Sequence, residues 1–284
     1  MRRSLLFIPG NKPGMVQNSD VFESDTVIFD LEDAVSVTEK DSARILVSNY
    51  LKTFKPNVEV CIRINGLDTT FYEEDLKEIV TEKVDAIMLP KARIDEVKKL
   101  DELLTTLEKE RKITKEIKII PIIELCISLI EVDQIAFLNR VDGILLGAED
   151  LSKDLEVERT KSGEEIFYAR SRIANACKAA KIDAIDTPFT DTLDKEGLEK
   201  DARFSKKLGM NAKSAIHPNQ IEVINEVYLP TQKEINWALR VIKAKEENFA
   251  KGIGVFSLDG KMVDKPVIES AEKVVIKAKR YKVI

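Results

Sequence analysis

Eight short apolar segments alternate with stretches of helical periodicity along residues 1–225, and this count predicts a closed (β/α)8 barrel of the TIM type. The segments are almost wholly apolar, as expected of parallel strands buried on both faces. Polar residues follow most of them directly, as in a barrel whose reactive groups gather at the carboxyl ends of its strands. A doubly wound open sheet is the alternative, but no GxGxxG motif follows the first segment to support dinucleotide binding.

Length and composition are consistent with one barrel and a tail. The chain has 284 residues, of which 44% are hydrophobic and 33% charged, so we expect a folded globular protein. A net charge of -5 argues against a nucleic-acid partner. The three cysteines lack CxxC spacing and no apolar run is long enough to span a membrane, so we expect a protein of the reducing cytoplasm.

The predicted strands follow from apolar runs that end in turn residues or in polar residues. The third run alternates apolar residues around Arg63, and the first ends in the turn chemistry of residues 10–14. In chain order, the eight predicted strands are residues 4–9, 27–31, 59–64, 86–89, 117–123, 143–146, 184–186 and 212–216. The segment after the fourth strand has helical spacing, and another helix is predicted at about 164–181.

The pattern changes after the eighth strand. Thr231 and Glu234 have the spacing of a capping box, which predicts a helix to about residue 248. A glycine-rich segment from Gly252 follows, with Asp259-Gly260 as a hairpin signal, and a last helix is predicted from about residue 267. We therefore expect residues 1–225 to form the barrel with the metal and substrate site, and residues 226–284 to form a helical lid and oligomerisation segment.

Eight polar residues at strand ends are expected to point into one mouth: Asp30, Asp33, Arg63, Lys91, Glu124, Asp150, Asp186 and His217. Glu124 and Asp150 could together hold one hard divalent cation and leave coordination sites for substrate. The alternative is that Glu124 starts a helix and Asp150 caps one. The acids of residues 30–33 likewise fit either a cation site or a solvated turn.

These residue types favour carbon–carbon bond chemistry beside a keto acid. A cation can polarise the oxygen of such an acid, and Arg63 can bind a carboxylate or stabilise an enolate. Lys91 and Lys213 could form Schiff bases, but a strand-end lysine near several acids is more often an ion-pair partner. The single histidine, His217, completes no Ser/His/Asp set and is expected to be structural.

Eight motifs, in this order, resemble the citrate lyase beta subunits, within the wider group of citrate lyases, malyl-CoA lyases and aldolases. They cover residues 2 to about 280: Arg3-Ser-Leu-Leu-Phe-Ile-Pro-Gly, Phe29-Asp-Leu-Glu-Asp-Ala-Val, Ile62-Arg-Ile-Asn, Leu89-Pro-Lys, Ile122-Ile-Glu, Leu146-Gly-Ala-Glu-Asp-Leu, Lys213-Ser-Ala-Ile-His-Pro-Asn-Gln-Ile and Gly260-Lys-Met-Val-Asp-Lys-Pro. Residues 163–171 and 223–231 are more similar to citrate lyase subunits than to stand-alone CoA lyases.

The resemblance implies a Mg2+-dependent TIM barrel whose metal ligands match Glu124 and Asp150. It implies that Arg63 binds substrate and that the backbone of Gly147, Ala148 and Glu149 forms a carboxylate cradle. We also assign Asp33 and Glu124 to the substrate site. Asp264 matches a general base that the family supplies to the barrel of a neighbouring subunit.

The function that the resemblance implies is cleavage of a citryl thioester, carried by acyl carrier protein or CoA, to oxaloacetate and the acetyl thioester. Such a chain is a beta subunit that works with alpha and gamma (acyl carrier) subunits, and we expect a homotrimer or hexamer. One alternative is a malyl-CoA or citramalyl-CoA lyase of the same family. A non-catalytic scaffold barrel is the alternative from another class.

Overall fold

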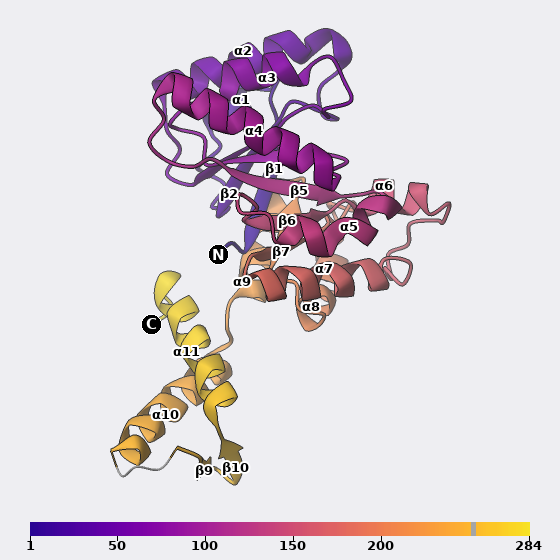
Figure 1. Cartoon of the computed structure of the whole chain (residues 1–284). Helices are drawn as coiled ribbons and strands as arrows, with labels where there is room; N and C mark the ends of the chain where they lie inside the picture. The colour runs from indigo at the N-terminus through magenta and orange to yellow at the C-terminus, as the bar shows by residue number, and fades with distance from the viewer. Residues whose placement is uncertain (251–253) are drawn as a thin grey trace. The chain divides into compact units, whose positions relative to one another are not determined.

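The computed structural model describes residues 1–250 and 254–284 and confirms the predicted barrel. Eight parallel strands pair in sequence order, and the last pairs with the first to close the barrel (Figure 1). The strands are β1 (Ser4–Pro9), β2 (Thr26–Asp30), β3 (Glu59–Arg63), β4 (Ala86–Leu89), β5 (Lys118–Ile123), β6 (Gly143–Leu146), β7 (Asp183–Asp186) and β8 (Ala212–Ala215). All eight correspond to predicted segments, with ends that differ by one residue at most.

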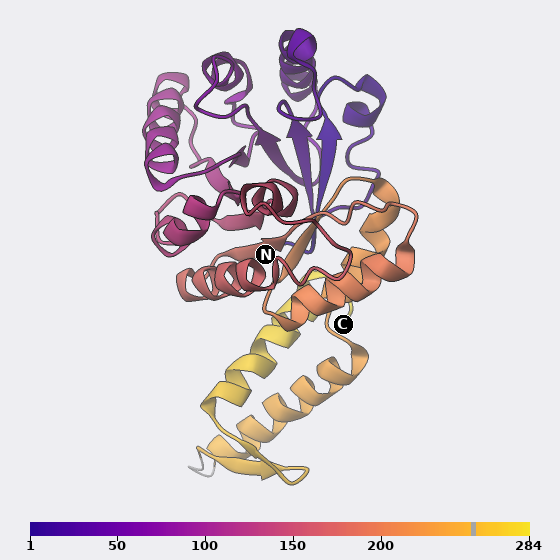
Figure 2. The ribbon, with the colours of Figure 1, turned by 90° about the vertical axis from the view of Figure 1, so that its right-hand side faces the viewer.

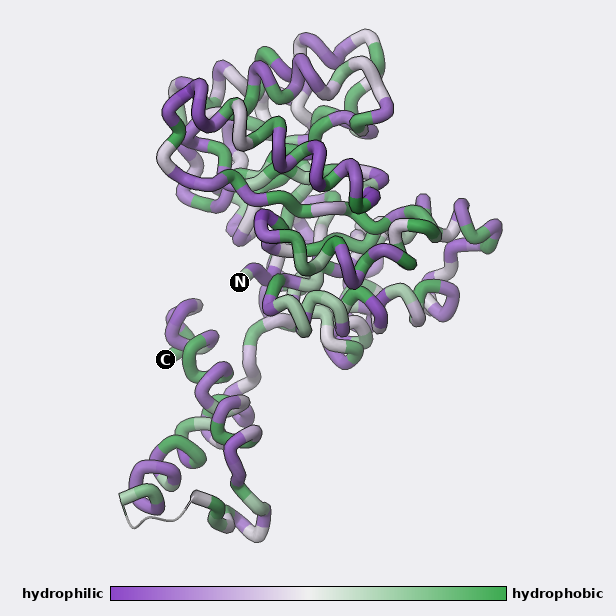
Figure 3. Tube along the Cα trace, in the orientation of Figure 1, coloured by the Kyte–Doolittle hydropathy of each residue, from purple (hydrophilic) through white to green (hydrophobic). Residues whose placement is uncertain are grey.

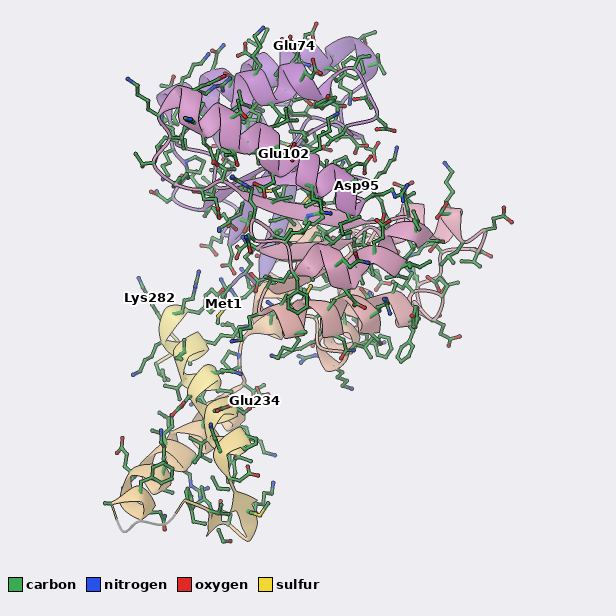
Figure 4. The ribbon with its side chains drawn as sticks, in the orientation of Figure 1. Met1, Glu74, Asp95, Glu102, Glu234 and Lys282 are labelled. Atoms are coloured by element: carbon green, nitrogen blue, oxygen red, sulfur yellow. The ribbon has the colours of Figure 1, made fainter. Side chains whose placement is uncertain are left out.

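Helices cover the outside of the barrel. Figure 3 shows them alternating between hydrophobic and hydrophilic residues, and in Figure 4 Glu74, Asp95 and Glu102 project outward from the surface of α3 and α4. The helices of this part are α1 (Pro13–Gln17), the 3-10 turn η1 (Val37–Glu39), α2 (Lys40–Thr53), α3 (Tyr72–Ile79), α4 (Ile94–Arg111), α5 (Cys126–Ala136), α6 (Ala148–Asp154), α7 (Phe167–Ala180), α8 (Lys195–Lys207), the 3-10 turn η2 (Pro218–Gln220) and α9 (Ile221–Tyr228).

Side chains that alternate along the strands fill the barrel interior. Leu5, Ile28 and Cys61 point inward from β1, β2 and β3, while their neighbours Leu6 and Val27 are buried outside this inner cluster. The inner cluster is completed by Ala86, Met88, Ile120, Ile122, Leu145, Ile185 and Ala212. The interior of the barrel is therefore a packed core and not an open channel.

The amino ends of the strands carry a dense ion-pair network. Arg2 is 4% exposed and donates to both carboxylate oxygens of Glu59, at 2.5 and 2.6 Å. The same guanidinium contacts Asp142 at 2.7 Å and Asp183 at 2.9 Å. The amino group of Met1 lies 3.3 Å from Asp183. Each carboxylate of this network therefore has a cationic partner within the chain.

The described chain divides into two compact units, Met1–Glu226 and Val227–Ile284. The second contains α10 (Gln232–Phe249), the strands β9 (Phe256–Leu258) and β10 (Lys261–Val263), and α11 (Lys265–Arg280), with its helices side by side in Figures 1 and 2. Ala238, Val241, Val263 and other apolar residues form a separate core there. The lid and oligomerisation roles of residues 226–284 stay a prediction.

Local signals in the second unit are confirmed. Thr231 and Glu234 form the predicted capping box. Asp259 and Gly260 have positive φ values of 55° and 75° in the turn between β9 and β10, as the hairpin signal predicts. Gly252, in the glycine-rich segment, lies outside the described residues. The last helix begins two residues earlier than predicted, because Asp264 caps it.

The cysteines and the helix lengths agree with the composition. Cys61, Cys126 and Cys177 are free thiols. Within residues 1–250 and 254–284, no helix combines the length and the apolar character that crossing a membrane requires.

Candidate active site

A cavity of about 420 Å³ opens at the carboxyl ends of the strands in the first unit. It collects most of the predicted site residues: Asp30, Asp33, Arg63, Glu124, Gly147, Ala148, Glu149 and Asp150. Its remaining lining is largely apolar and comprises Phe7, Pro9, Ala34, Ile122, Leu145, Thr187, Pro188 and Ile216. A mainly apolar cleft with a few convergent charges is the usual form of a small-molecule site.

Arg63 is held in this cavity by Asp30. The two residues end β3 and β2 and are paired in register, so their side chains meet. Arg63 Nε and Nη2 donate to the two Asp30 oxygens at 2.7 and 2.6 Å, and the guanidinium lies over the Phe7 ring at 4.9 Å. This pairing satisfies the charge of an arginine that lies in an otherwise apolar strand. The fork is therefore used within the chain, and the Nη1 edge lies toward Glu32 and Asp33.

Hydrogen bonds made by Asp30 and Lys40 fix the turn after β2. Asp30 accepts hydrogen bonds from the backbone N–H groups of Glu32 (2.9 Å) and Ala34 (3.1 Å). The buried Lys40 ammonium donates to the carbonyls of Leu31 and Glu32, at 2.9 and 2.7 Å. The acidic turn is thus an ordered structure with its own cation.

The two outer acids of this turn face Arg63 at different distances. Glu32 Oε2 lies 3.2 Å from Arg63 Nη1, and Asp33 Oδ2 lies 3.9 Å away. Burial raises the pKa of Glu32 to about 7, opposed by Arg63 and reinforced by Asp33 and Asp30. Asp33, 68% exposed, lines the cavity wall, as expected of a residue at its entrance.

Glu124 follows β5 and is almost completely buried, at 5% exposure. Its Oε1 accepts a hydrogen bond of 2.5 Å from the backbone N–H of Lys91. Gly147 makes room for it, because a Cβ at that position would lie 2.6 Å from Glu124 Oε2 and from its Cβ. The end of β6 therefore requires glycine so that the carboxylate of Glu124 fits beside it.

Glu124 and Asp150 form a carboxylate pair that suits a divalent cation. Burial raises the pKa of Glu124 to about 7, and the charge of Asp150 raises it further against the Lys91 N–H and Arg63. Two carboxylates that destabilise each other's charge in one cavity fit a cation between them. The described residues contain no group of three or more His, Cys, Asp or Glu side chains arranged for a metal. Mg2+ commonly takes only one or two protein carboxylates, and substrate and water complete its shell.

The backbone cradle predicted at Gly147, Ala148 and Glu149 is partly used within the chain. The N–H of Gly147 donates to the carbonyl of Ile123 at 3.0 Å, and that of Ala148 donates to the Thr187 hydroxyl at 3.3 Å. The Glu149 side chain is 55% exposed and lies 3.3 Å from Arg159 Nε. A substrate carboxylate could take the Ala148 donor only by replacing Thr187.

The prediction that Asp186 points into the mouth is wrong, because two cations hold it inside the barrel wall. Asp186 is fully buried and accepts from Arg170 Nε at 2.8 Å and from Lys213 Nζ at 2.7 Å. Burial opposes its charge, but Lys213 and Arg170 together lower the pKa of Asp186. Lys213 also contacts Asp201 at 2.7 Å. Lys213 is therefore an ion-pair partner, the alternative we favoured over a Schiff base.

Lys91 and His217 do not line the cavity either. The exposed Lys91 side chain lies outside, and only its backbone N–H reaches Glu124. His217 caps the turn η2, where its Nδ1 accepts from the N–H of Asn219 at 3.2 Å. Both residues lie two positions after the end of their strands, but their exposed side chains are outside the cavity, so strand-end position predicted them wrongly.

Asp264 belongs to the second unit and caps α11. Its Oδ1 accepts from the N–H of Val267 at 3.2 Å, and Pro266 occupies the first turn of the helix. A capping role and a role as a base are compatible, because the cap uses one carboxylate oxygen. Its assignment as a general base stays a prediction.

Eight residues of the cavity lining were not predicted as site residues, and Phe7, Thr187 and Ile216 are instructive among them. Phe7 lies two residues after the inward Leu5, so strand alternation could have placed it inside. Thr187 and Ile216 directly follow β7 and β8. Neither carries a charge, and the search for polar strand ends passed over them.

The chain is similar in sequence to several known proteins. The family model of the HpcH/HpaI aldolase/citrate lyase family matches residues 3–218. Citrate lyase subunit beta of Leuconostoc mesenteroides subsp. cremoris is 44% identical over 278 residues, covering 96% of this chain and 92% of the relative. Mitochondrial citramalyl-CoA lyase of Rattus norvegicus is 30% identical, covering 99% of this chain and 87% of the relative.

Two solved structures are also similar to this chain. The protein CitE of Mycobacterium tuberculosis, in complex with magnesium, acetoacetate and coenzyme A, superposes with a TM-score of 0.80 at 29% identity, covering 98% of each chain. A citrate lyase of Burkholderia xenovorans has a TM-score of 0.86 at 18% identity, which supports the fold.

Proposed function

Since the chain belongs to the HpcH/HpaI aldolase/citrate lyase family, we propose that it is a Mg2+-dependent carbon–carbon lyase that cleaves a citryl thioester to oxaloacetate and an acetyl thioester. The observation that carries this proposal is the carboxylate pair Glu124 and Asp150, which shares a cavity with Arg63. The relatives with the higher identities are citrate lyase beta subunits, at 37–44%.

Each residue of the cavity has a distinct task. Glu124 and Asp150 would hold Mg2+, which when bound supplies a Lewis acid for the oxygen on the reacting carbon. Arg63, fixed by Asp30, places a positive charge where the substrate's carboxylate or the developing enolate lies. Phe7, Ile122 and Leu145 give the cavity an apolar floor that excludes water from that enolate.

We assign the proton transfer to Asp264 of a neighbouring subunit. In cleavage, its carboxylate takes the proton of the substrate hydroxyl, the carbon–carbon bond breaks, and the acetyl thioester leaves as an enolate that is then protonated. Closure of residues 226–284 as a lid would exclude water. This arrangement needs an oligomer, and we propose a homotrimer or hexamer.

Mixing two inactive variants tests the assignment of Asp264. Asp264→Asn keeps the helix cap, because asparagine caps as well as aspartate does, but removes the base. Combined with Glu124→Gln, it should recover part of the activity, since some mixed sites pair an intact metal site with an intact lid. Full activity of Asp264→Asn alone removes it as the base. No recovery in verified mixed oligomers contradicts the arrangement between subunits.

The carrier of the thioester and the assembly follow from the same relatives. As a beta subunit, the protein would act on citryl acyl carrier protein, or on citryl-CoA, beside the alpha and gamma subunits of citrate lyase. The three free thiols fit a reducing compartment, and we propose the cytoplasm.

A turnover assay on three thioesters tests the function. The purified protein with Mg2+ is given citryl, malyl and citramalyl thioesters side by side, and keto-acid release is measured. Our proposal expects oxaloacetate from the citryl thioester at the highest kcat/KM. Preference for the citramalyl thioester would instead favour the activity named for the Rattus norvegicus relative. No release from any of them would support the scaffold barrel.

A further inference from the structure

The backbone at Lys91 is in an unusual conformation for a residue so close to the cavity. Its φ of 49° lies in the left-handed region, which is uncommon for residues other than glycine. Lys91 follows Pro90 directly after β4, and the exposed ammonium has no ion pair or hydrogen bond among the residues that the structure describes. The local conformation is therefore not explained by what the lysine side chain does.

The conformation of Lys91 is explained by the direction in which it points the backbone N–H groups. The N–H of Lys91 donates to Glu124 Oε1 at 2.5 Å, and the next N–H, of Ala92, donates to the carbonyl of Ile122 at 3.2 Å. Two consecutive amides thus bind the end of β5 from the β4 side. A charge-assisted hydrogen bond is among the stronger hydrogen bonds in proteins, and this one fixes one oxygen of Glu124, a cavity residue that is only 5% exposed.

Glu124 is bounded from two directions. Gly147 leaves room on the β6 side, where a Cβ would lie 2.6 Å from Oε2, and the Lys91 amide binds Oε1 on the β4 side. The position of the carboxylate therefore depends on one hydrogen bond and on the absence of a side chain at position 147. Groups that orient a metal ligand in this way commonly alter metal affinity by about 10–100-fold when they are lost.

We propose that Lys91 is a positioning residue for the metal site, that it acts through its left-handed backbone amide, and that its side-chain charge takes no part. This inference rests on the proposed Mg2+ site at Glu124. It assigns to the Leu89-Pro-Lys motif a role that differs from both a Schiff base and an ion pair.

Four substitutions separate the backbone from the side chain. Lys91→Gly and Lys91→Asn remove the charge and introduce residues that tolerate a positive φ. Lys91→Ala also removes the charge, and alanine resists a positive φ about as much as lysine does. Lys91→Ile is β-branched and strongly resists this conformation. Calorimetric titration with Mg2+ alone should give affinities within about twofold of wild type for Gly, Asn and Ala, and a loss of about 10-fold for Ile.

Lys181 provides a matched control. It is an exposed lysine with a positive φ of 62° at the C-terminal cap of α7. Lys181→Ile introduces the same residue into the same backbone region, so it should lower the melting temperature and leave Mg2+ affinity unchanged. If Lys91→Ile does not fold, Lys91→Thr, a smaller β-branched residue, replaces it.

Three outcomes overturn the inference. Wild-type affinity in folded Lys91→Ile or Lys91→Thr shows that the amide is not needed. Equal losses in Lys91→Ala and Lys91→Ile show that the charge matters. An equal loss in Lys181→Ile shows a general effect of destabilisation.

Amide exchange separates this inference from the proposed function. The N–H of Lys91 should be protected in wild type and should exchange faster in Glu124→Ala, whether or not Mg2+ binds. If wild type binds no Mg2+ but this protection is seen, the proposed function fails and the positioning of Glu124 stands. If the amide is unprotected in wild type, the inference itself is wrong.

Discussion

The two ends of the barrel both carry arginine and carboxylate side chains, but they differ in how the carboxylates are paired with cations. At the amino end, Arg2 and the Met1 amino group lie within ion-pair distance of Glu59, Asp142 and Asp183. At the carboxyl end, one arginine among the cavity lining faces five acids: Asp30, Asp33, Glu124, Glu149 and Asp150. Each acid named at the first end has a cation of the chain within 3.3 Å, whereas the acids that line the cavity outnumber its one arginine by five to one.

This difference separates structure from function. An ion-pair network that is satisfied within the chain makes the loss of any one partner costly, but it leaves no unpaired charge for a ligand. Buried carboxylates whose charges repel cost free energy unless a cation joins them, and such sites are typical of function. Glu124, with its pKa raised to about 7, belongs to the second kind.

Replacing the arginine at each end should give the largest contrast. Arg63→Lys keeps the charge but loses the paired bonds to Asp30, so kcat/KM should fall about tenfold or more, in line with about 1.5–3 kcal/mol for a charge-assisted hydrogen bond. Arg2→Lys should instead lower the free energy of unfolding by a similar amount and leave kcat/KM nearly unchanged. Steady-state kinetics and urea unfolding of both variants measure this. Near-wild-type kinetics in Arg63→Lys would remove Arg63 from the mechanism.

Gly143, the first residue of β6, and Gly147, the residue directly after this strand, make a smaller contrast. Gly147→Ala places a Cβ against Glu124 at the carboxyl end, and we expect kcat/KM and Mg2+ affinity to fall by about 10-fold. In Gly143→Ala, at the amino end, the new Cβ lies 3.2 Å from the Asp183 carbonyl oxygen, a less severe contact than the 2.6 Å at Gly147. It should change only the melting temperature. Equal kinetic losses in the two variants would show that any strain in β6, at either end, disturbs the site.

Two lysines that clamp carbonyl groups give the smallest contrast. Lys40 donates to the carbonyls of Leu31 and Glu32 under the acidic turn, whereas Lys83 donates to those of Lys52 and Phe54 at the amino end. Lys40→Met should lower kcat/KM by about 3–10-fold, because it loosens the turn that fixes Arg63. Lys83→Met should leave kcat/KM unchanged. Comparable kinetics in both variants would mean that the turn keeps its shape without Lys40.

Much of the barrel was predictable, because strands that are buried on both faces consist of continuous apolar runs. Even the short strand β7 (Asp183–Asp186) was predicted, because it lies between two helices. The helix ends were less accurate. The helix predicted at about 164–181 is Phe167–Ala180, and its N-cap is Ile166, which forms no side-chain cap, so no capping residue marked its start.

The site was predictable in part for a similar reason. Register pairs Asp30 with Arg63 at two strand ends, so position along the strand was enough to find them. Position was not enough for Asp186, because its orientation depends on Arg170 and Lys213 from elsewhere in the chain. The role of the Lys91 backbone depends on a φ value, which the sequence does not show.

The most direct test of the contrast between the two ends is a calorimetric titration of Mg2+. We predict one site per chain in wild type, a loss of about 100-fold or more in affinity in both Glu124→Gln and Asp150→Asn, and wild-type affinity in Glu59→Gln and Asp183→Asn. Unchanged Mg2+ binding in Glu124→Gln and Asp150→Asn would contradict it, and would favour a barrel that serves only as a scaffold.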